Sequence, residues 1–183
     1  MSQVVPTRPD QAYAVPASAF IAAYQRHGID WILTVPDFVQ LSIHSRLAQG
    51  DTGIKVLTCA NENQAVQTAA GLYVGGKRAV VMIQNQGFYN CMNAVRALGL
   101  DANIPLVFAI GQFGREFSNL GGDPRQSKRR MVSLLEPTLD AFSIPYFRAE
   151  HPNDAGAIDQ AIESAYSRQQ PAALLIGHYT SWE

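Results

Sequence analysis

Short apolar runs alternate with helix-like segments about six times along this chain of 183 residues. The runs read DWILTVP, IKVLTC, AVVMIQ, PLVFAIG, IPYFRA and AALLIG. Their apolar residues are continuous, which is typical of strands buried on both faces of a parallel sheet. Segments of helical period between them then cover both faces through right-handed crossovers. The sequence therefore predicts an α/β fold with a doubly wound, mainly parallel six-stranded sheet and helices on both faces.

The N-terminal stretch differs from the rest of the chain. Its first 16 residues include three prolines, which predicts an irregular arm over 1–16 and one domain over 17–183. The formal net charge of −1 indicates neither nucleic acid nor an anionic membrane as a partner. No signal-peptide pattern and no apolar run of about 20 residues is present. Cys59 and Cys91 have no metal or disulfide spacing, so we expect free thiols and a cytoplasmic protein.

The stretch GLYVGGKR, residues 71–78, matches the first positions of a P-loop. A P-loop follows a strand and precedes a helix, whereas here a predicted helix comes first and a strand follows. Arg78 also stands where a serine or threonine would hold magnesium. We therefore interpret Gly75 and Gly76 as the end of a helix and predict no phosphate site.

Polar residues follow the first four predicted strands as VPD, ANEN, QNQG and GQFGRE. Ligands of open parallel sheets bind beyond the carboxyl ends of the strands, so these residues are the first candidates for a site. Glu62 stands in the first turn of a helix for which Asn61 is a suitable cap. Taken alone, a glutamate in this position has a structural explanation, because carboxylates stabilise helix N-termini.

The stretch NENQAVQTAAGLYVGGKRAVVMIQNQG resembles the pyrimidine-binding domain of thiamin diphosphate enzymes. In that family a glutamate opens a helix, small residues and a glycine follow, and a strand ends in a turn. The segments VPD and NAVRALGLDANIPLVFAIGQFGRE fit the same family. The resemblance runs from about residue 17 to the C-terminus. It is greatest to the alpha subunit of sulfopyruvate decarboxylase and to the N-terminal half of phosphonopyruvate decarboxylase.

The resemblance implies roles for individual residues. Glu62 would bond N1′ of the coenzyme's aminopyrimidine, favouring the tautomer that removes the C2 proton, and would be buried with a raised pKa. Asp37 would be a second catalytic group that handles protons; a turn aspartate that caps the next helix is the alternative. Pro36, Gln86 and Asn90 would border or bind the cofactor, although Asn90 also fits an ordinary helix surface.

Three residues are candidates for substrate binding. Gln84 and Asn85 offer neutral donors and acceptors, which bind anionic oxygens but are not general acids at neutral pH. Arg115 follows the fourth strand and is a candidate anion clamp. The basic stretch RQSKRR, residues 125–130, fits either an anion-attracting segment or a solvated loop. His44 has no partner motif, so we interpret it as structural.

The family's diphosphate and magnesium site has no counterpart in this chain. That site carries Gly-Asp-Gly and a later Asn-Asn pair, whereas here GGDPR places Pro124 at the last glycine and Asn-Asn is missing. The resemblance implies no metal ligands here and a separate diphosphate-binding beta subunit that holds thiamin diphosphate through Mg²⁺. We predict the alpha subunit of a heteromeric decarboxylase for a small anionic 2-oxo acid. A carboligase subunit and a non-catalytic regulatory module are the alternatives.

Overall fold

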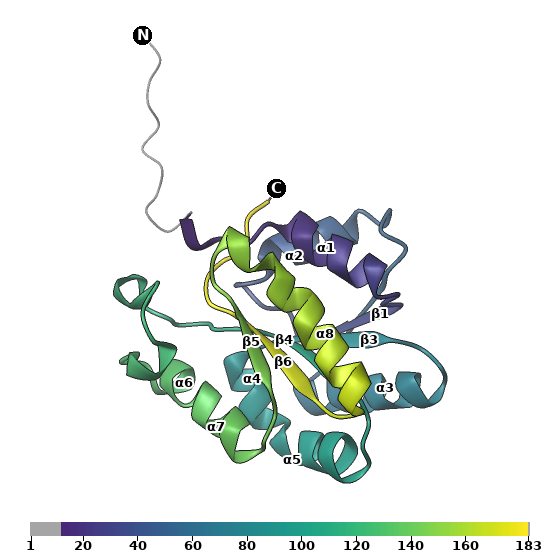
Figure 1. Ribbon diagram of the computed structural model, residues 1–183. Coiled ribbons are helices and arrows are strands. Elements are labelled where there is room, and N and C mark those ends of the chain that lie inside the picture. The colour runs from purple at the N-terminus through teal and green to yellow at the C-terminus, as the bar shows by residue number, and fades with distance from the viewer. Residues whose placement is uncertain (1–11, 183) are drawn as a thin grey trace.

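A computed structural model describes residues 12–182 of the chain and gives an α/β fold. Its six strands form one all-parallel sheet in the order β2-β1-β3-β4-β6-β5 (Figure 1). The strands are β1 (Trp31–Thr34), β2 (Lys55–Thr58), β3 (Ala79–Gln84), β4 (Val107–Gly111), β5 (Tyr146–Ala149) and β6 (Ala172–Ile176). The predicted six-stranded parallel sheet is confirmed.

Helices cover both faces of the sheet (Figure 1). One face carries α1 (Ala17–Arg26), α2 (Leu41–Ala48) and α8 (Gly156–Arg168). The other carries α3 (Glu62–Val74), α4 (Asn85–Asn90), α5 (Met92–Ala94), the π-helix η2 (Val95–Asp101) and α7 (Leu135–Ala141). Shorter elements are α6 (Arg130–Ser133) and the 3-10 turns η3 (Phe117–Asn119), η4 (Pro124–Gln126) and η5 (Pro152–Ala155).

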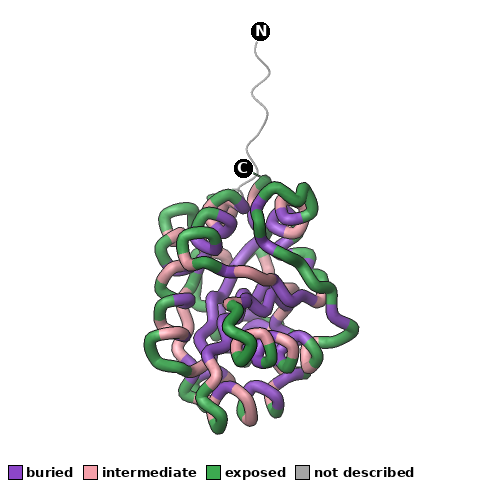
Figure 2. The backbone as a smooth tube through the Cα atoms, turned by 90° about the vertical axis from the view of Figure 1, so that its right-hand side faces the viewer, coloured by how far each residue is buried: buried purple, intermediate pink, exposed green. Residues whose placement is uncertain are grey.

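Two hydrophobic cores lie on the two sides of the sheet. Consecutive strand residues point to opposite faces, so Ile32 joins the core under α1, α2 and α8 while Leu33 joins the core under α3 and α4. Both side chains are fully buried, and buried backbone runs through the middle of the molecule (Figure 2). The edge strand β2 differs, because all four of its residues are exposed. Only one neighbouring strand, β1, pairs with it.

The start of the domain is tied to its C-terminal end. Residues 1–11 of the predicted arm lie outside the described residues. Val15 is buried, and the backbone N–H of Ser181 donates to its carbonyl at 3.0 Å. The N–H of Ala17 donates to the Ser181 carbonyl, also at 3.0 Å. The last residues before α1 are therefore paired with residue 181, and α1 begins at Ala17.

The P-loop-like stretch ends a helix, as predicted. Helix α3 finishes at Val74, Gly76 adopts φ 76°, and β3 begins at Ala79. The Arg78 guanidinium lies over the Tyr166 ring at 3.8 Å from its centroid. This stretch lies at the amino end of the strands, opposite the edge described next.

Candidate active site

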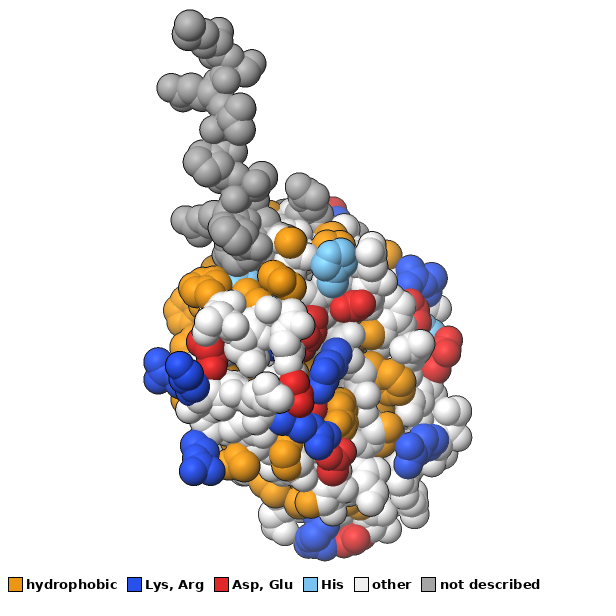
Figure 3. Space-filling model, turned by 60° about the vertical axis from the view of Figure 1, so that its left-hand side comes forward, with side chains coloured by type: hydrophobic (Ala, Val, Ile, Leu, Met, Phe, Trp, Pro, Cys, Tyr) orange, Lys and Arg blue, Asp and Glu red, His pale blue; other side chains and the backbone are white. Residues whose placement is uncertain are grey.

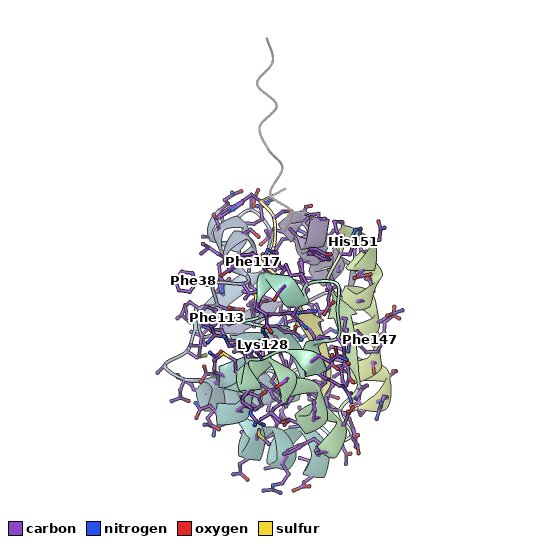
Figure 4. The ribbon with its side chains drawn as sticks, turned by 90° about the vertical axis from the view of Figure 1, so that its left-hand side faces the viewer. Phe38, Phe113, Phe117, Lys128, Phe147 and His151 are labelled. Carbon is purple, nitrogen blue, oxygen red and sulfur yellow. The ribbon has the colours of Figure 1, made fainter. Side chains whose placement is uncertain are left out.

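The site forms at the carboxyl edge of the sheet, which faces the viewer in Figure 4. From β1 the chain passes outward to β2, whereas from β3 it passes to β4 on the other side. The adjacent strands β1 and β3 thus flank the point where the strand order reverses. Ligand sites of open parallel sheets lie at this point. The ends of β1, β2 and β3 carry Asp37, Glu62 and Gln86 in the segments that follow them.

Glu62 is the first residue of α3. The Asn61 side chain caps this helix by accepting from the Gln64 N–H at 3.0 Å, which confirms the predicted cap. The Glu62 Oε2 accepts from Asn90 Nδ2 at 2.9 Å, and Asn63 Nδ2 donates to the Asn90 carbonyl at 3.2 Å. The structure thus brings Glu62 and Asn90 together from helices on two different crossovers.

Gly87, the glycine of QNQG, leaves room for the Glu62 side chain. A Cβ at position 87 would lie 2.5 Å from Glu62 Cγ and 2.6 Å from its Oε1. Real Cβ atoms do not approach other atoms this closely. The Glu62 side chain therefore packs directly against Gly87, and a larger residue at position 87 would displace it.

The expectation that Glu62 is buried is not met in this single chain, where the residue is half-buried. The reason is its place at the open edge of the sheet, between the exposed Asn61 and Asn90. Cys91, behind it, is fully buried. Burial, together with the nearby Glu62 charge, raises the pKa of the Cys91 thiol to about 12. Cys59 and Cys91 are free thiols, as expected.

Asp37 is buried, with 2% of its surface exposed. Its Oδ1 accepts from the Val39 N–H and its Oδ2 from Gln40 Nε2, each at 2.9 Å. A Cβ at Gly111 would lie 2.0 Å from Oδ2, so the carboxyl group lies against the end of β4. Burial raises its pKa to about 6, against the opposing hydrogen bonds from Gln40 and Val39. The bond to Val39 organises the turn before α2.

Gln40 is a residue that sequence reasoning missed. Its side chain is fully buried, and Nε2 lies within hydrogen-bond distance of Asp37 Oδ2 and of the carbonyls of Ile83 (3.2 Å) and Ala109 (3.1 Å). It therefore links the Asp37 carboxyl to β3 and β4. A glutamine three residues after Asp37 was the only signal in the sequence.

Asn85 is not open to a substrate, which corrects the role expected for it. The residue is fully buried, and its Nδ2 donates to the carbonyls of Phe113 (3.0 Å) and Met131 (2.9 Å). Its Oδ1 accepts from the Gln86 N–H at 3.0 Å. Asn85 thus fixes the segment between β4 and α6. Gln86 is exposed, and Gln84 is half-buried immediately before α4.

Arg115 is also engaged within the protein. Its side chain is 2% exposed and pairs with Glu150 at 2.5 Å. The Nε donates to Asn119 Oδ1 at 2.9 Å, Nη1 to Gln112 Oε1 at 3.1 Å, and Nη2 to the Gly122 carbonyl at 2.9 Å. These contacts use the guanidinium donors, so Arg115 anchors the loop after β4 instead of clamping an anion.

The basic stretch 125–130 contributes to an ion-pair network at its first residue. Arg125 pairs with Glu136 at 2.9 Å and with Asp140 at 2.7 Å, and Arg148 pairs with Glu136 at 2.7 Å. The Glu136 side chain is fully buried. Basic and acidic side chains are interspersed on this side of the molecule (Figure 3). Arg125 is therefore part of a structural cluster.

A pocket of ≈ 250 Å³ opens beside Asp37. It is lined by Pro36, Asp37, Phe38, Leu41 and His44. Phe38 and Leu41 are 65% and 48% exposed. The His44 Nε2 accepts from the Asp37 N–H at 3.4 Å, and burial lowers the pKa of the imidazole. A neutral histidine thus borders a pocket with an apolar wall.

Neither a metal cluster nor a membrane helix appears in the described part of the chain. Residues 12–182 contain no group of three or more His, Cys, Asp and Glu side chains placed to hold a metal ion. None of the described helices is long and apolar enough to cross a membrane.

The fold and the edge site agree with one protein family. Residues 16–144 match the family described as thiamine pyrophosphate enzyme, N-terminal TPP binding domain. The chain belongs to this family, which confirms the resemblance found in the sequence.

The relatives that resemble the chain over most of its length carry one name, sulfopyruvate decarboxylase subunit alpha. The protein from Methanocaldococcus jannaschii is 29% identical over 158 residues, covering 86% of this chain and 90% of the relative. That from Methanococcus maripaludis is 25% identical over 81% of this chain and 86% of its own length. The protein from Methanothermobacter thermautotrophicus is 24% identical over 76% of this chain and 81% of its own length.

Proposed function

We propose that this chain is the alpha-type subunit of a heteromeric thiamin diphosphate-dependent decarboxylase of small anionic 2-oxo acids of the sulfopyruvate or phosphonopyruvate type. Membership of the thiamine pyrophosphate enzyme family and the names of the relatives support this proposal. The observation that carries it is Glu62, which lies at the switch point of the sheet in space left by Gly87. A non-catalytic module would not need that fitted arrangement.

Glu62 holds the coenzyme's aminopyrimidine at N1′ in this proposal. Its Oε2 is oriented by Asn90, while the structure gives Oε1 no hydrogen-bond partner within residues 12–182. Gln86, exposed one residue before Gly87, contacts the same ring in this proposal. When bound, thiamin diphosphate supplies the electron sink for the carbon–carbon bond that breaks on loss of carbon dioxide. The residues present fit the pyrimidine end of this group.

Asp37 holds or releases a proton beside the pocket that Pro36 borders. A pKa of about 6 gives it both protonation states near neutral pH, which suits proton exchange. Gln84, half-buried at the end of β3, remains a candidate donor to the substrate's oxygens. Asn85 and Arg115 are left out of this proposal, because their donors are used inside the protein.

A separate subunit binds the diphosphate and Mg²⁺ in this proposal. The described residues include no metal cluster of their own. Phe38 and Leu41 expose apolar surface beside the site, as expected of a face that a partner covers. The same cover would complete the burial of Glu62.

Co-expression with a diphosphate-binding subunit tests the proposal. We expect thiamin diphosphate-dependent release of carbon dioxide from sulfopyruvate or phosphonopyruvate, and a loss of about 10²-fold or more in Glu62→Gln. Glu163→Gln is the matched control, since Glu163 is exposed on α8 away from the site. Full turnover in the Glu62→Gln complex would reject the assigned role. Analysis of the product as aldehyde or acyloin separates decarboxylation from carboligation.

A further inference from the structure

A second pocket of ≈ 290 Å³ lies at the carboxyl ends of β4 and β6. Gln112, Val39 and Gly177 are buried in its wall, while Phe117, Tyr179 and Arg129 are exposed around it. Phe113 and Phe117, on the segment after β4, are on the side of the molecule seen in Figure 4. The segment GQFGRE, residues 111–116, which the sequence placed among the first candidates for a site, forms much of its wall.

Gln112 lines this pocket and carries a buried amide nitrogen that has no hydrogen-bond partner among the described residues. The residue is 2% exposed, and Oε1 accepts from Arg115 Nη1 at 3.1 Å. Because a guanidinium only donates hydrogen bonds, this contact fixes which end of the amide faces Arg115. The opposite end, Nε2, is buried without a hydrogen-bond partner among the described residues. A buried donor left unpaired is unfavourable, so the site is suited to an incoming acceptor.

The surrounding strands hold Gln112 in this orientation. Arg115 is fixed by Glu150, which follows β5, and by the loop carbonyls of Asn119 and Gly122. At Gly177, after β6, a Cβ would lie 2.7 Å from Arg115 Nη1 and 2.8 Å from Glu150 Cγ. The missing side chain at position 177 therefore makes room for the pair that orients the amide.

Charges of both signs, those of Arg129 and Glu116, line the pocket and interact with each other. Arg129 supplies a guanidinium on the exposed side. The one carboxylate in the lining, that of Glu116, already accepts from Ser127 Oγ at 2.6 Å and from the Lys128 N–H at 2.7 Å. These bonds satisfy the Glu116 carboxylate within its own loop.

The pocket adjoins the proposed catalytic edge. Val39 lines it and also donates its N–H to the Asp37 carboxyl group. Gly111, which packs against Asp37, immediately precedes Gln112. A small molecule seated here therefore lies next to the turn that carries Asp37.

We propose that this pocket binds the acidic tail of the 2-oxo acid, with Gln112 Nε2 donating to a sulfonate or phosphonate oxygen and Arg129 supplying the countercharge. This inference rests on the proposed function for the identity of the substrate. Gln112 is then a specificity-determining residue, distinct from Glu62.

Titration calorimetry of the purified chain tests the pocket without turnover. Sulfoacetate and phosphonoacetate serve as probes, because each carries a carboxylate and a sulfonate or phosphonate. We expect saturable binding that is about tenfold or more weaker in Gln112→Glu, which keeps the acceptor for Arg115 but removes the donors. Gln49→Glu adds the same charge at the exposed end of α2 and leaves binding unchanged.

Gln112→Met is the second variant, because it removes the donors without adding a charge. It is measured alongside Gln112→Glu and replaces it where that variant unfolds. Absence of saturable binding by the wild-type chain, or equal binding by the folded Gln112 variants, would overturn the proposal.

Kinetics of the assembled complex separate this inference from the proposed function. We expect the Gln112→Met complex to show a KM for the 2-oxo acid raised about tenfold with little change in kcat. If the Gln112→Met complex decarboxylates the 2-oxo acid with an unchanged KM, the proposed role of the pocket is rejected and the proposed function is retained. If probe binding depends on Gln112 but the complex decarboxylates no 2-oxo acid, the pocket is an anion site and the proposed function is rejected.

Discussion

Two glycines position the two carboxyl groups of the site. Gly87 leaves the space that the Glu62 side chain occupies, and Gly111 leaves the space for Asp37. Each glycine follows or ends a strand, and each carboxylate comes from a different crossover. Neither glycine has a positive φ, so the close approach of a side chain, and not the backbone conformation, requires them.

Gly87→Ala tests this packing at Glu62. We expect the unfolding free energy to change by no more than about 1 kcal/mol, because the half-buried Glu62 side chain can rotate away from the new methyl group. Displacing the carboxylate should lower kcat/KM of the complex about 10²-fold. Gly71→Ala is the control, since nothing lies within 4 Å of its Cβ and alanine favours the helix by about 0.5–1 kcal/mol. Wild-type activity in Gly87→Ala contradicts the packing.

Asp37 makes stability fall as the pH rises. Its pKa is raised to about 6 in the folded chain, so the folded state binds more protons than the unfolded state between about pH 4 and 6. The contribution of Asp37 to the free energy of unfolding is fully present below about pH 4 and is lost above about pH 6. The change is about 2–3 kcal/mol. Between pH 4.5 and 6.5 the free energy of unfolding of the wild type, measured with urea, should fall by a large part of this amount. The free energy of unfolding of Asp37→Asn should not show this fall.

The segment between β4 and α6 is held by side chains that follow two other strands, β3 and β5. Asn85 after β3 bonds its two ends at Phe113 and Met131. Arg115, within this segment, forms an ion pair with Glu150, which follows β5. An internal network therefore orders a polar loop whose sequence gave no regular pattern.

Arg115→Met should destabilise the chain by about 3 kcal/mol, because the half-buried Glu150 carboxylate loses its partner. The double variant Arg115→Met with Glu150→Leu should recover much of this loss, since neither charge then remains. Urea unfolding measures both values, and limited proteolysis reports on the loop. Equal stability of the single variant and the wild type contradicts the anchoring role.

On the scale of the whole molecule, one edge combines the carboxyl groups, both site pockets and exposed apolar side chains. Phe38 and Leu41 lie beside Asp37, and β2 exposes Val56 and Leu57 at the end of the sheet. Scattered apolar residues are normal on a protein surface, but here Phe38 and Leu41 line the pocket beside Asp37. This edge is the face that we propose the diphosphate-binding subunit covers.

Phe38→Asp should weaken association with that subunit about tenfold or more, because large apolar side chains dominate binding at interface centres. The melting temperature of the isolated chain should not change, since Phe38 is 65% exposed. Val74→Asp is the control, at a residue that is 78% exposed and ends α3 at the opposite end from Glu62. Analytical ultracentrifugation of the mixed subunits measures the affinity. Equal weakening by both variants contradicts the assigned face.

The sequence alone determined the parallel sheet, the Asn61 cap and the end of α3, because these depend on apolar runs, helix termini and glycines close together in the chain. It also identified the family through the Glu62 and QNQG segments. It did not predict that the helix after β3 breaks at Cys91 into α4, α5 and the π-helix η2.

Only the tertiary structure decided which polar side chains face a ligand and which are used internally. Asn85 and Arg115 were reasonable candidates by position, yet Asn85 donates to carbonyls 28 and 46 positions away, and Arg115 bonds Glu150, 35 positions away, as well as its own loop. Gln40 gained its importance in the same way, through the carbonyls of Ile83 and Ala109. Hydrogen bonds between distant segments have no periodicity in the sequence, so packing of the strands and loops had to place them.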